Sequence, residues 1–477
     1  MFEACNIIRG PVSQDNFKDY ITPLLYYKRI SDVYDEETEE ALISSGGDKE
    51  YASLPEQHRF VIPDGCHWQE VRERTENFGA AIVGAMRQIE IANPDTLYGV
   101  LSMFSSQKWT NKAILNDSKI RDLIEHLSKR KLGNKDYPAD LMGDAYEILL
   151  KKFADDSKAQ AGEFYTPRSV VRLLVHILDP QPGETVYDPA CGSGGMLIEA
   201  IRYMHDDSLC CGSIFGQEKN VVNAAIAKMN LFLHGASDFN VMQGDTLRDP
   251  KILQGGNIAK FDCVIANPPF SLENWGATEW SSDKYKRNIY GTPSDSCGDY
   301  AWIQHMICSM VSGQGRMAVV MPQGILFRNQ ETEIRKQLVE SDLIEAVVTL
   351  GDKLFYGTGL SPCFLIIRRM KPAHHSGRIL MIDGSKILTQ KRAQNILEEN
   401  DIDRLYSLYQ NYSDEEDYSR IVTLQEIRDK EYNLSPNRYV VYHKEEIRPY
   451  AEVLAEFKHA YEEVKRLEEE FSLLINA

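Results

Sequence analysis

The fold of this chain is decided by residues 185–197, which are TVYDPACGSGGML. A short β-branched run ends at Asp188, a glycine-rich turn follows, and an apolar helical pattern opens after the turn. Glycines allow a tight turn and let a ligand approach the backbone without meeting a Cβ atom. Amide groups at the start of the following helix favour a carboxylate or a phosphate. The stretch therefore predicts a strand, a ligand-binding turn and a helix.

The acid at the start of this turn narrows the choice of ligand. No Lys-Ser or Lys-Thr pair follows the glycines, so the pattern of a phosphate-binding P-loop is absent. The carboxylate of Asp188 is better suited to the ammonium group of an amino acid moiety.

Short apolar runs alternate with helical patterns from about residue 160 onward. After the run that ends at Asp188, further runs occupy 213–215, 240–242, 262–266, 317–321, 346–350 and 363–367. Helical patterns between them include 223–234 and 300–311. This alternation predicts βαβ units and a mostly parallel sheet. Ligands of such sheets bind beyond the carboxyl ends of the strands.

Two more acids follow strand ends, Glu218 after the second run and Asp245 after the third. Glu218 can accept hydrogen bonds from ribose hydroxyls, as in dinucleotide folds, and Asp245 can accept one from an adenine amino group. Any one of these acids alone is better explained as a helix cap or a loop residue. Together with Asp188, they indicate a ligand that combines adenosine with an amino acid.

The run at 262–266 ends in Asn267-Pro268-Pro269-Phe270. The prolines stop the strand and have no N–H group, so nearby carbonyls lack neighbouring donors. Asn267 offers an amide oxygen and Phe270 a stacking face, which together can hold a planar exocyclic amine. A plain proline-rich turn is the alternative, and the ligand pattern upstream favours the amine site.

In combination these motifs resemble adenine-N6 DNA methyltransferases. The stretch GEFYTPR at 162–168 narrows the resemblance to the modification (methyltransferase) subunit of type I restriction–modification systems. GDYAW at 298–302, GRMAVVMP at 315–322 and LFYGTG at 354–359 support it. The resemblance covers about residues 15–370 clearly and the remainder loosely.

The resemblance implies a cofactor, S-adenosyl-L-methionine, and the transfer of its methyl group to a flipped-out adenine. The implied cofactor-binding residues are Glu163, Phe164, Tyr165, Thr166, Pro167, Arg168, Asp188, Cys191, Gly192, Ser193, Gly194, Gly195, Glu218, Asp245 and Asn267. The implied catalytic residues, which hold the target adenine, are Asn267, Pro268, Pro269 and Phe270. Many adenine methyltransferases carry Tyr where this chain has Phe270, and either ring can stack on a base.

The chain is acidic, with 53 Lys and Arg against 71 Asp and Glu and a net charge of −18. Bulk charge therefore cannot hold double-stranded DNA. The resemblance implies that a separate DNA-specificity subunit is a partner. It also implies two further partners, a second copy of the chain and a restriction (nuclease/translocase) subunit. The segment 271–299 either holds an opened DNA strand or is a solvated loop. Its aromatic and basic residues are Trp275, Trp280, Lys284, Lys286, Arg287 and Tyr290.

Several classes are excluded or disfavoured. No apolar run reaches the ~18 residues of a membrane helix, and the N-terminus lacks the pattern of a secretory signal. No Cys-x-x-Cys or His-Glu-x-x-His occurs. We expect a cytoplasmic protein with reduced thiols, no metal and no membrane contact.

The expected fold is α/β: a Rossmann-like S-adenosylmethionine-dependent methyltransferase domain between an all-helical N-terminal domain and a C-terminal helical tail. The predicted domains are 1–155, 156–400 and 401–477. Apolar stripes at 17–25, 82–89 and 141–153 indicate N-terminal helices, with polar loops near 35–50 and 105–115. A heptad-like stripe at 447–474 predicts a long helix that starts close to Pro449. This helix docks a specificity subunit or packs on the chain's own N-terminal helices.

Two rival functions remain open from the sequence. Asn-Pro-Pro-aromatic motifs also serve protein-glutamine methyltransferases, because a side-chain amide presents a similar planar amine. A cofactor-binding scaffold in a phage-defence assembly is the second rival, and the intact motif at 267–270 argues against it.

Overall fold

The computed structural model describes residues 2–12, 16–97, 99–101, 109–137, 141, 166–204, 212–236, 238–355, 361–391, 394–443 and 450–475. The chain forms two compact units, Met1–Val440 and Val441–Ala477. Of the stripe predicted at 141–153, only Leu141 belongs to the described residues. Among the described helices, none combines the length and the hydrophobicity that a membrane span requires.

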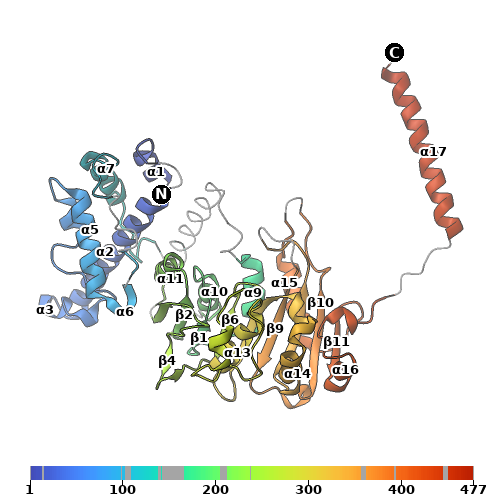
Figure 1. Ribbon diagram of the computed structural model, residues 1–477. Helices are drawn as coiled ribbons and strands as arrows, with labels where there is room; N and C mark the ends of the chain where they lie inside the picture. Colours follow the sequence, from blue (N-terminus) through green and yellow to red (C-terminus); the bar gives the residue numbers. More distant parts are fainter. Residues whose placement is uncertain are drawn as a thin grey trace. The chain divides into compact units, whose positions relative to one another are not determined.

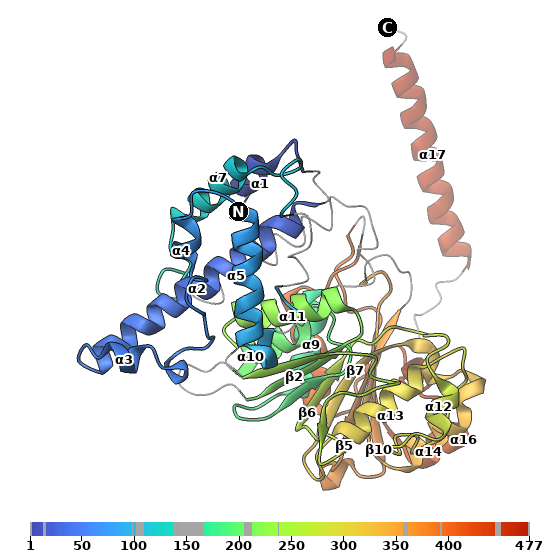
Figure 2. The ribbon, with the colours of Figure 1, turned by 60° about the vertical axis from the view of Figure 1, so that its left-hand side comes forward.

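The N-terminal part of the first unit is helical (Figures 1 and 2). Its α-helices are α1 (Phe2–Ile8), α2 (Lys18–Ser44), α3 (Lys49–Ala52), α4 (Trp68–Arg72), α5 (Phe78–Ala92), α6 (Pro94–Leu97) and α7 (Asp117–Ser128). The predicted stripes at 17–25 and 82–89 are the buried faces of α2 and α5. The loop predicted from residue 35 is wrong up to Ser44, because α2 continues through its acidic stretch. Glutamate is a good helix former, and polarity alone does not end a helix.

The remainder of the first unit is built on a nine-stranded sheet in the order β11-β10-β8-β9-β7-β6-β1-β2-β3. The strands are β1 (Val186–Asp188), β2 (Ile214–Glu218), β3 (Phe239–Gln243), β6 (Cys263–Ala266), β7 (Arg316–Pro322), β8 (Ile344–Leu350), β9 (Pro362–Arg368), β10 (Arg378–Gly384) and β11 (Ser419–Thr423). β9 is antiparallel to β7 and β8, β11 is antiparallel to β10, and the other pairings are parallel. A hairpin of β4 (Leu253–Gln254) and β5 (Asn257–Ile258) stands apart.

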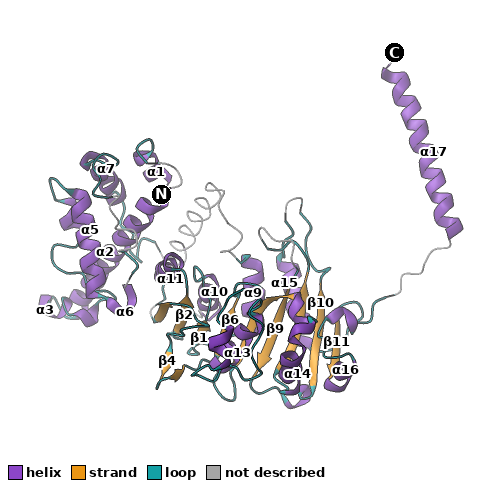
Figure 3. Cartoon of the chain, viewed as in Figure 1, coloured by secondary structure: helices purple, strands orange, loops and turns teal. Residues whose placement is uncertain are grey.

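Helices cover both faces of this sheet (Figure 3). One face carries α9 (Arg168–Leu178), α10 (Gly195–Met204), α11 (Val221–Leu233) and α15 (Glu399–Asn411), and the other carries α13 (Asp299–Ser309), α14 (Thr332–Glu340) and α16 (Leu424–Asp429). Alternate strand residues enter the two cores, so Ala318 and Val320 of β7 face one layer while Met317 and Val319 face the other. The predicted α/β, mostly parallel architecture is therefore confirmed.

The N-terminal helices contact the sheet part through α11. The ring of Phe232, near the end of α11, lies 5.3 Å from that of Tyr26 on α2 and 4.9 Å from that of Phe60. All three side chains are buried. This aromatic cluster joins the helical part to the helix layer over β1, β2 and β3.

The strand order reverses between β1 and β6. From β1 the chain builds outward through β2 to β3, then returns to place β6 on the other side of β1. Ligands of doubly wound sheets bind beyond the carboxyl ends at such a reversal. The turn that begins at Asp188 and the motif that begins at Asn267 follow these two neighbouring strands.

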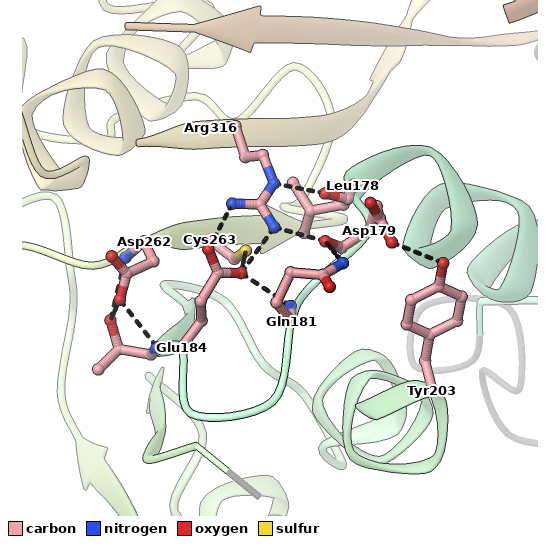
Figure 4. A network of polar contacts seen from close by, with 9 residues as sticks. Leu178, Asp179, Gln181, Glu184, Tyr203, Asp262, Cys263 and Arg316 are labelled. Atoms are coloured by element: carbon pink, nitrogen blue, oxygen red, sulfur yellow. Dashed lines mark hydrogen bonds and ion pairs between the residues drawn. The ribbon is translucent and has the colours of Figure 1, made fainter. Parts of the chain in front are cut away.

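The opposite, amino edge of the sheet is held by a polar network around Arg316 (Figure 4). Its guanidinium donates to both carboxylate oxygens of Glu184, at 2.9 and 2.6 Å, and to the carbonyl of Leu178 at 2.6 Å. Asp262 accepts from the N–H and the hydroxyl of Thr185, at 3.0 and 2.7 Å. Burial alone would raise the pKa of Glu184, but the bonds from Arg316 offset burial and leave that pKa lowered. The network stabilises the sheet at the end away from the predicted site.

Residues 401–440 also belong to the first unit. β11 pairs with β10, and α15, which crosses position 400, packs on α9. The first unit therefore continues past the domain boundary predicted at residue 400.

The domain boundary predicted at residue 155 lies outside the described residues. In the second unit, α17 (Tyr450–Ile475) is a helix of 26 residues that begins next to Pro449, as the sequence predicted.

Candidate active site

The turn after β1 closes onto the end of β2. Asp188 is 2% exposed, and its Oδ1 accepts the N–H of Ala190 at 2.9 Å. Gly192 and Gly194 have φ values of +53° and +85°, a region in which a side chain is strained. The N–H of Gly192 donates to Oε2 of Glu218 at 3.0 Å. The turn thus brings two of the predicted acids to one edge of the sheet.

The carboxyl group of Asp188 is strongly perturbed. Burial raises its pKa to about 8; the N–H of Ala190 opposes this rise, and the negative charge of Glu218 adds to it. No cation of the described residues contributes to this shift, so without a ligand the folded chain favours the protonated carboxyl. A cation such as an ammonium group would favour the ionised form.

Glu218 and Asp245 lie at the ends of adjacent strands, but their environments differ. Oε1 of Glu218 accepts the N–H of Asn220 at 2.7 Å. Asp245 forms an ion pair with Lys219, with 2.9 Å between Oδ2 and Nζ. The N–H of Gly244 donates to the carbonyl of Glu218 at 2.9 Å, which ties the two strand ends together. Each carboxylate keeps acceptor capacity for a ligand, because an oxygen can accept more than one hydrogen bond.

Cys191 is a packing residue of the turn. Its side chain is 5% exposed, and a Cβ atom on Gly216 of β2 would lie only 3.0 Å from its Sγ. Burial raises the pKa of the Cys191 thiol, which keeps it protonated and unreactive. Ser193 anchors the turn through its carbonyl, which accepts from the Asn230 amide at 2.8 Å, and Gly195 begins α10.

Asn267 follows β6 and has an unsatisfied acceptor. Its Nδ2 donates to the hydroxyl of Thr166 at 2.8 Å, which fixes the orientation of the amide. Its Oδ1 is buried and accepts no hydrogen bond from the residues that the structure describes. A buried acceptor without a donor costs about 1–3 kcal/mol, so this oxygen suits a ligand that brings an N–H.

Phe270 has an aromatic neighbour, Phe355, that is not among the predicted site residues. The ring centroids of Phe270 and Phe355 are 6.4 Å apart, with 54° between the ring planes. Phe355 lies in the LFYGTG stretch, which supported the family resemblance. Nothing in the sequence places its ring beside Phe270. Between the asparagine and the phenylalanine, Pro268 is buried and Pro269 is exposed.

Of the predicted cofactor-binding residues 163–168, the structure describes Thr166, Pro167 and Arg168. Glu163, Phe164 and Tyr165 lie outside the described residues. Thr166 contacts Asn267, and Pro167 caps α9. Nε of Arg168 lies 3.8 Å from Oε2 of Glu199 on α10, beside a surface hollow. The other residues that line this hollow are Ser169, Arg172 and Glu399.

The segment 271–299 is mostly structural. Trp275 and Trp280 are each 2% exposed, and Arg287 is 1% exposed. Arg287 donates to both oxygens of Asp283, at 3.0 and 2.8 Å, and stacks over the Trp280 ring. For these three residues both interpretations of the segment, a surface that holds an opened DNA strand and a solvated loop, are wrong, because they are buried against each other and the sheet. Lys284 and Lys286 remain exposed.

The sheet order, the glycine-rich turn and the acids at the strand ends place this protein in the Rossmann-like class of doubly wound α/β proteins. Among the described residues, no group of three or more His, Cys, Asp and Glu is arranged to hold a metal ion.

Comparison with known proteins identifies the family. The N-6 DNA methylase model matches residues 137–447, and the HsdM N-terminal domain model matches residues 1–127. The MjaVII type I restriction enzyme methylase subunit of Methanocaldococcus jannaschii is 35% identical over 94% of this chain and 78% of its own length. The HindI methylase subunit of Haemophilus influenzae is 31% identical over 73% of this chain and 76% of its own length.

A solved structure supports the same family assignment. The methyltransferase subunit of the type I restriction–modification system from Streptococcus thermophilus superimposes with a TM-score of 0.77 and 26% identity, over 93% of this chain and 98% of that one. The chain belongs to the N-6 DNA methylase family, among the methylase subunits of type I restriction enzymes. It is accordingly an adenine-N6 DNA methyltransferase.

Proposed function

We propose that the chain binds S-adenosyl-L-methionine beyond the carboxyl ends of β1, β2 and β3 and methylates N6 of an adenine flipped out of duplex DNA. The single observation that carries this proposal is Oδ1 of Asn267, which is buried and accepts no hydrogen bond from any residue that the structure describes. It lies after β6, next to the strand that ends in Asp188, so an amine held there is close to the cofactor turn.

The residues after β1, β2 and β3 fit this cofactor. Asp188 would hold the ammonium group, because a buried carboxyl with a raised pKa gains most from a cation. The turn from Gly192 to Gly194 would surround the amino acid moiety. Glu218 would accept the ribose hydroxyls and Asp245 the adenine amino group. When bound, the cofactor supplies an electrophilic methyl group.

The loop after β6 would activate the target amine. The N6 group of adenine is conjugated to the ring and is a weak nucleophile. Oδ1 of Asn267 and the carbonyl of Pro268 would accept its two hydrogens, which localises the lone pair on nitrogen. The bond from Asn267 to Thr166 orients the amide in advance, so the effect is one of position and electrostatics.

The base must leave the helix to reach these groups. Flipping costs a few kcal/mol, which stacking on aromatic rings and contacts to DNA offset. Phe270 would stack on the adenine, with the ring of Phe355 beside it.

Glu218→Ala should weaken cofactor binding by about 1–3 kcal/mol through the loss of charge-assisted hydrogen bonds. Isothermal titration calorimetry on the chain without DNA measures this change. Glu399→Ala, which removes an exposed acid of α15, is the matched control and should leave the affinity unchanged. An unchanged affinity in Glu218→Ala would remove Glu218 from the site.

A separate specificity subunit would supply sequence recognition, and α17 would dock it. Within the second unit, taken by itself, the apolar stripe of α17 is exposed: Tyr450 79%, Phe457 67%, Tyr461 59%, Val464 53%, Leu467 53% and Phe471 64%. A lone helix with such a stripe gains stability only when the stripe is buried. A coiled-coil or groove contact with a partner would bury it. A second copy of the chain and a restriction subunit would complete the assembly.

Truncation after residue 445 should leave the chain folded and able to bind the cofactor, but unable to co-purify with its specificity subunit or to methylate DNA. The reason is that residues 1–440 form a compact unit without α17. Co-purification and cofactor titration of the truncated chain measure both effects. Unfolding or loss of cofactor binding would instead assign the stripe to the chain's own core.

The family match favours DNA methylation over both rivals. Labelled methyl groups should enter DNA rather than a protein glutamine. Cofactor binding without turnover, with every partner present, would favour the scaffold instead.

A further inference from the structure

The loop that carries the proposed base-binding residues continues into a strained backbone position. Ser271, directly after Phe270, has a φ value of +49°. A side-chain-bearing residue pays a conformational cost in this left-handed region and stays there only when its surroundings hold it. The N–H of Ser271 donates to Oδ1 of Asp299 at 2.7 Å, and the next carbonyl, of Leu272, accepts from the N–H of Gly298 at 3.0 Å.

Asp299 is itself held from a third loop. It begins α13, is 0% exposed, and forms an ion pair with Arg328 through its second oxygen. Arg328 lies after β7, between the short helices η3 (Gln323–Leu326) and η4 (Asn329–Glu331). Nε of Arg328 also lies 3.1 Å from Oε2 of the buried Glu331. A buried carboxylate requires such a partner, because desolvation is otherwise strongly unfavourable.

We propose that Asp299 and Arg328 are positioning residues of the methyl-transfer reaction: together they fix the peptide between Phe270 and Ser271 and so set the direction of the Phe270 ring toward the target base. This inference deepens the proposed function and rests on it. Neither side chain touches the base or the cofactor; each acts through the backbone of the loop.

The geometry explains why the effect falls on the base and spares the cofactor. The pair links the loops after β6 and β7, which are neighbouring strands. The proposed cofactor residues follow β1, β2 and β3 on the other side of β6. Without the pair, Ser271 can relax from its left-handed conformation and the ring of Phe270 moves with it. A misplacement of about 1 Å at a reacting group can cost on the order of 100-fold in rate.

The test compares variants of the full complex with its specificity subunit. Arg328→Met removes the cation, and Asp299→Asn keeps an acceptor for the Ser271 N–H while removing the negative charge. Both should lower kcat about 10- to 100-fold and leave the cofactor Kd within about twofold. Both should also change the fluorescence of 2-aminopurine placed at the target position, because this fluorescence is quenched by stacking and the variants alter the stacking of the flipped base on Phe270. Arg328→Lys restores the cation and should recover most of kcat.

Arg316→Met is the matched control, because Arg316 is paired with an acid, as Arg328 is, but lies at the amino edge of the sheet. It should lower the melting temperature and leave kcat and the 2-aminopurine signal unchanged. If Arg328→Met does not fold, the isosteric Asp299→Asn decides the same question.

Wild-type kcat in both Asp299→Asn and Arg328→Met would overturn the inference. A parallel loss of cofactor affinity and kcat, without recovery in Arg328→Lys, would also overturn it, since that pattern belongs to general structural damage. An inactive Asn267→Ala beside fully active Asp299 and Arg328 variants would reject the positioning role and keep the proposed function. A fully active Asn267→Ala would reject the proposed function itself.

Discussion

Replacing Asn267 by alanine should lower the rate of methyl transfer by on the order of 100-fold or more, with cofactor affinity and fold nearly intact. The substitution removes a buried amide oxygen that accepts no hydrogen bond from the residues described and that follows β6 at the switch point of the sheet. That oxygen is preorganised by the bond from the same side chain to Thr166, so its loss affects the reacting amine rather than the cofactor.

Single-turnover kinetics with labelled cofactor and the assembled complex measure this effect. Asn93→Ala is the control, because Asn93 is a buried asparagine whose amide bonds the backbone of the N-terminal helical part. It should lower stability without changing the rate of the folded enzyme. Methylation at the wild-type rate by Asn267→Ala would contradict the assignment of the site.

Asp188→Asn should weaken cofactor binding roughly 10- to 100-fold, because the ammonium group loses a charged partner. The same change should stabilise the unliganded protein. The introduced amide would still accept the N–H of Ala190, as Asp188 does at 2.9 Å, but would carry no charge to be buried. A single substitution that weakens ligand binding and stabilises the unliganded protein is typical of a group that serves binding at the expense of stability.

The stabilisation should depend on pH with a definite sign. An unfolded aspartate releases its proton near pH 4, whereas burial raises the pKa of Asp188 to about 8 in the folded chain. Between these values the folded chain holds a proton that the unfolded chain has lost, so rising pH disfavours the folded state. The advantage of Asp188→Asn should grow from about pH 4 to pH 8, reach on the order of 5 kcal/mol for a pKa difference of about four units, and then level off.

Chemical denaturation of both proteins at several pH values, without cofactor, measures this difference. A difference that is independent of pH would show that the Asp188 carboxyl titrates normally. Asp188→Asn with wild-type cofactor affinity would place the ammonium group elsewhere.

The sequence predicted the parts of the site that depend on local chain chemistry. A strand that ends in an acid before glycines, or in Asn267 before two prolines, has few structural alternatives. Because the carboxyl ends of parallel strands share one edge, spacing along the chain was enough to bring Asp188, Glu218 and Asn267 to that edge.

Contacts between distant segments could not be predicted in this way. The bond between Asn267 and Thr166, the ring pair of Phe270 and Phe355, and the pairing of Asp299 with Arg328 join loops that only the fold brings together. No periodicity in the sequence specifies them.

The burial of Trp280 and Arg287 was missed for a different reason. Aromatic residues interleaved with basic ones are typical of nucleic-acid surfaces, but the same side chains also form buried cation–π pairs. The guanidinium of Arg287 lies 4.4 Å from the centroid of the Trp280 ring. Composition does not distinguish the two, whereas the hydrogen bonds of Arg287 to Asp283 and to backbone carbonyls do.

The most direct measurement is the identity of the methylated product. The chain, assembled with its specificity subunit, would be incubated with unmethylated DNA and cofactor that carries a labelled methyl group, and the DNA would then be digested to nucleosides. The structure predicts label in N6-methyldeoxyadenosine at one recognition sequence, and none with Asn267→Ala. Label in protein glutamine, label in another base, or equal labelling by Asn267→Ala would contradict the account.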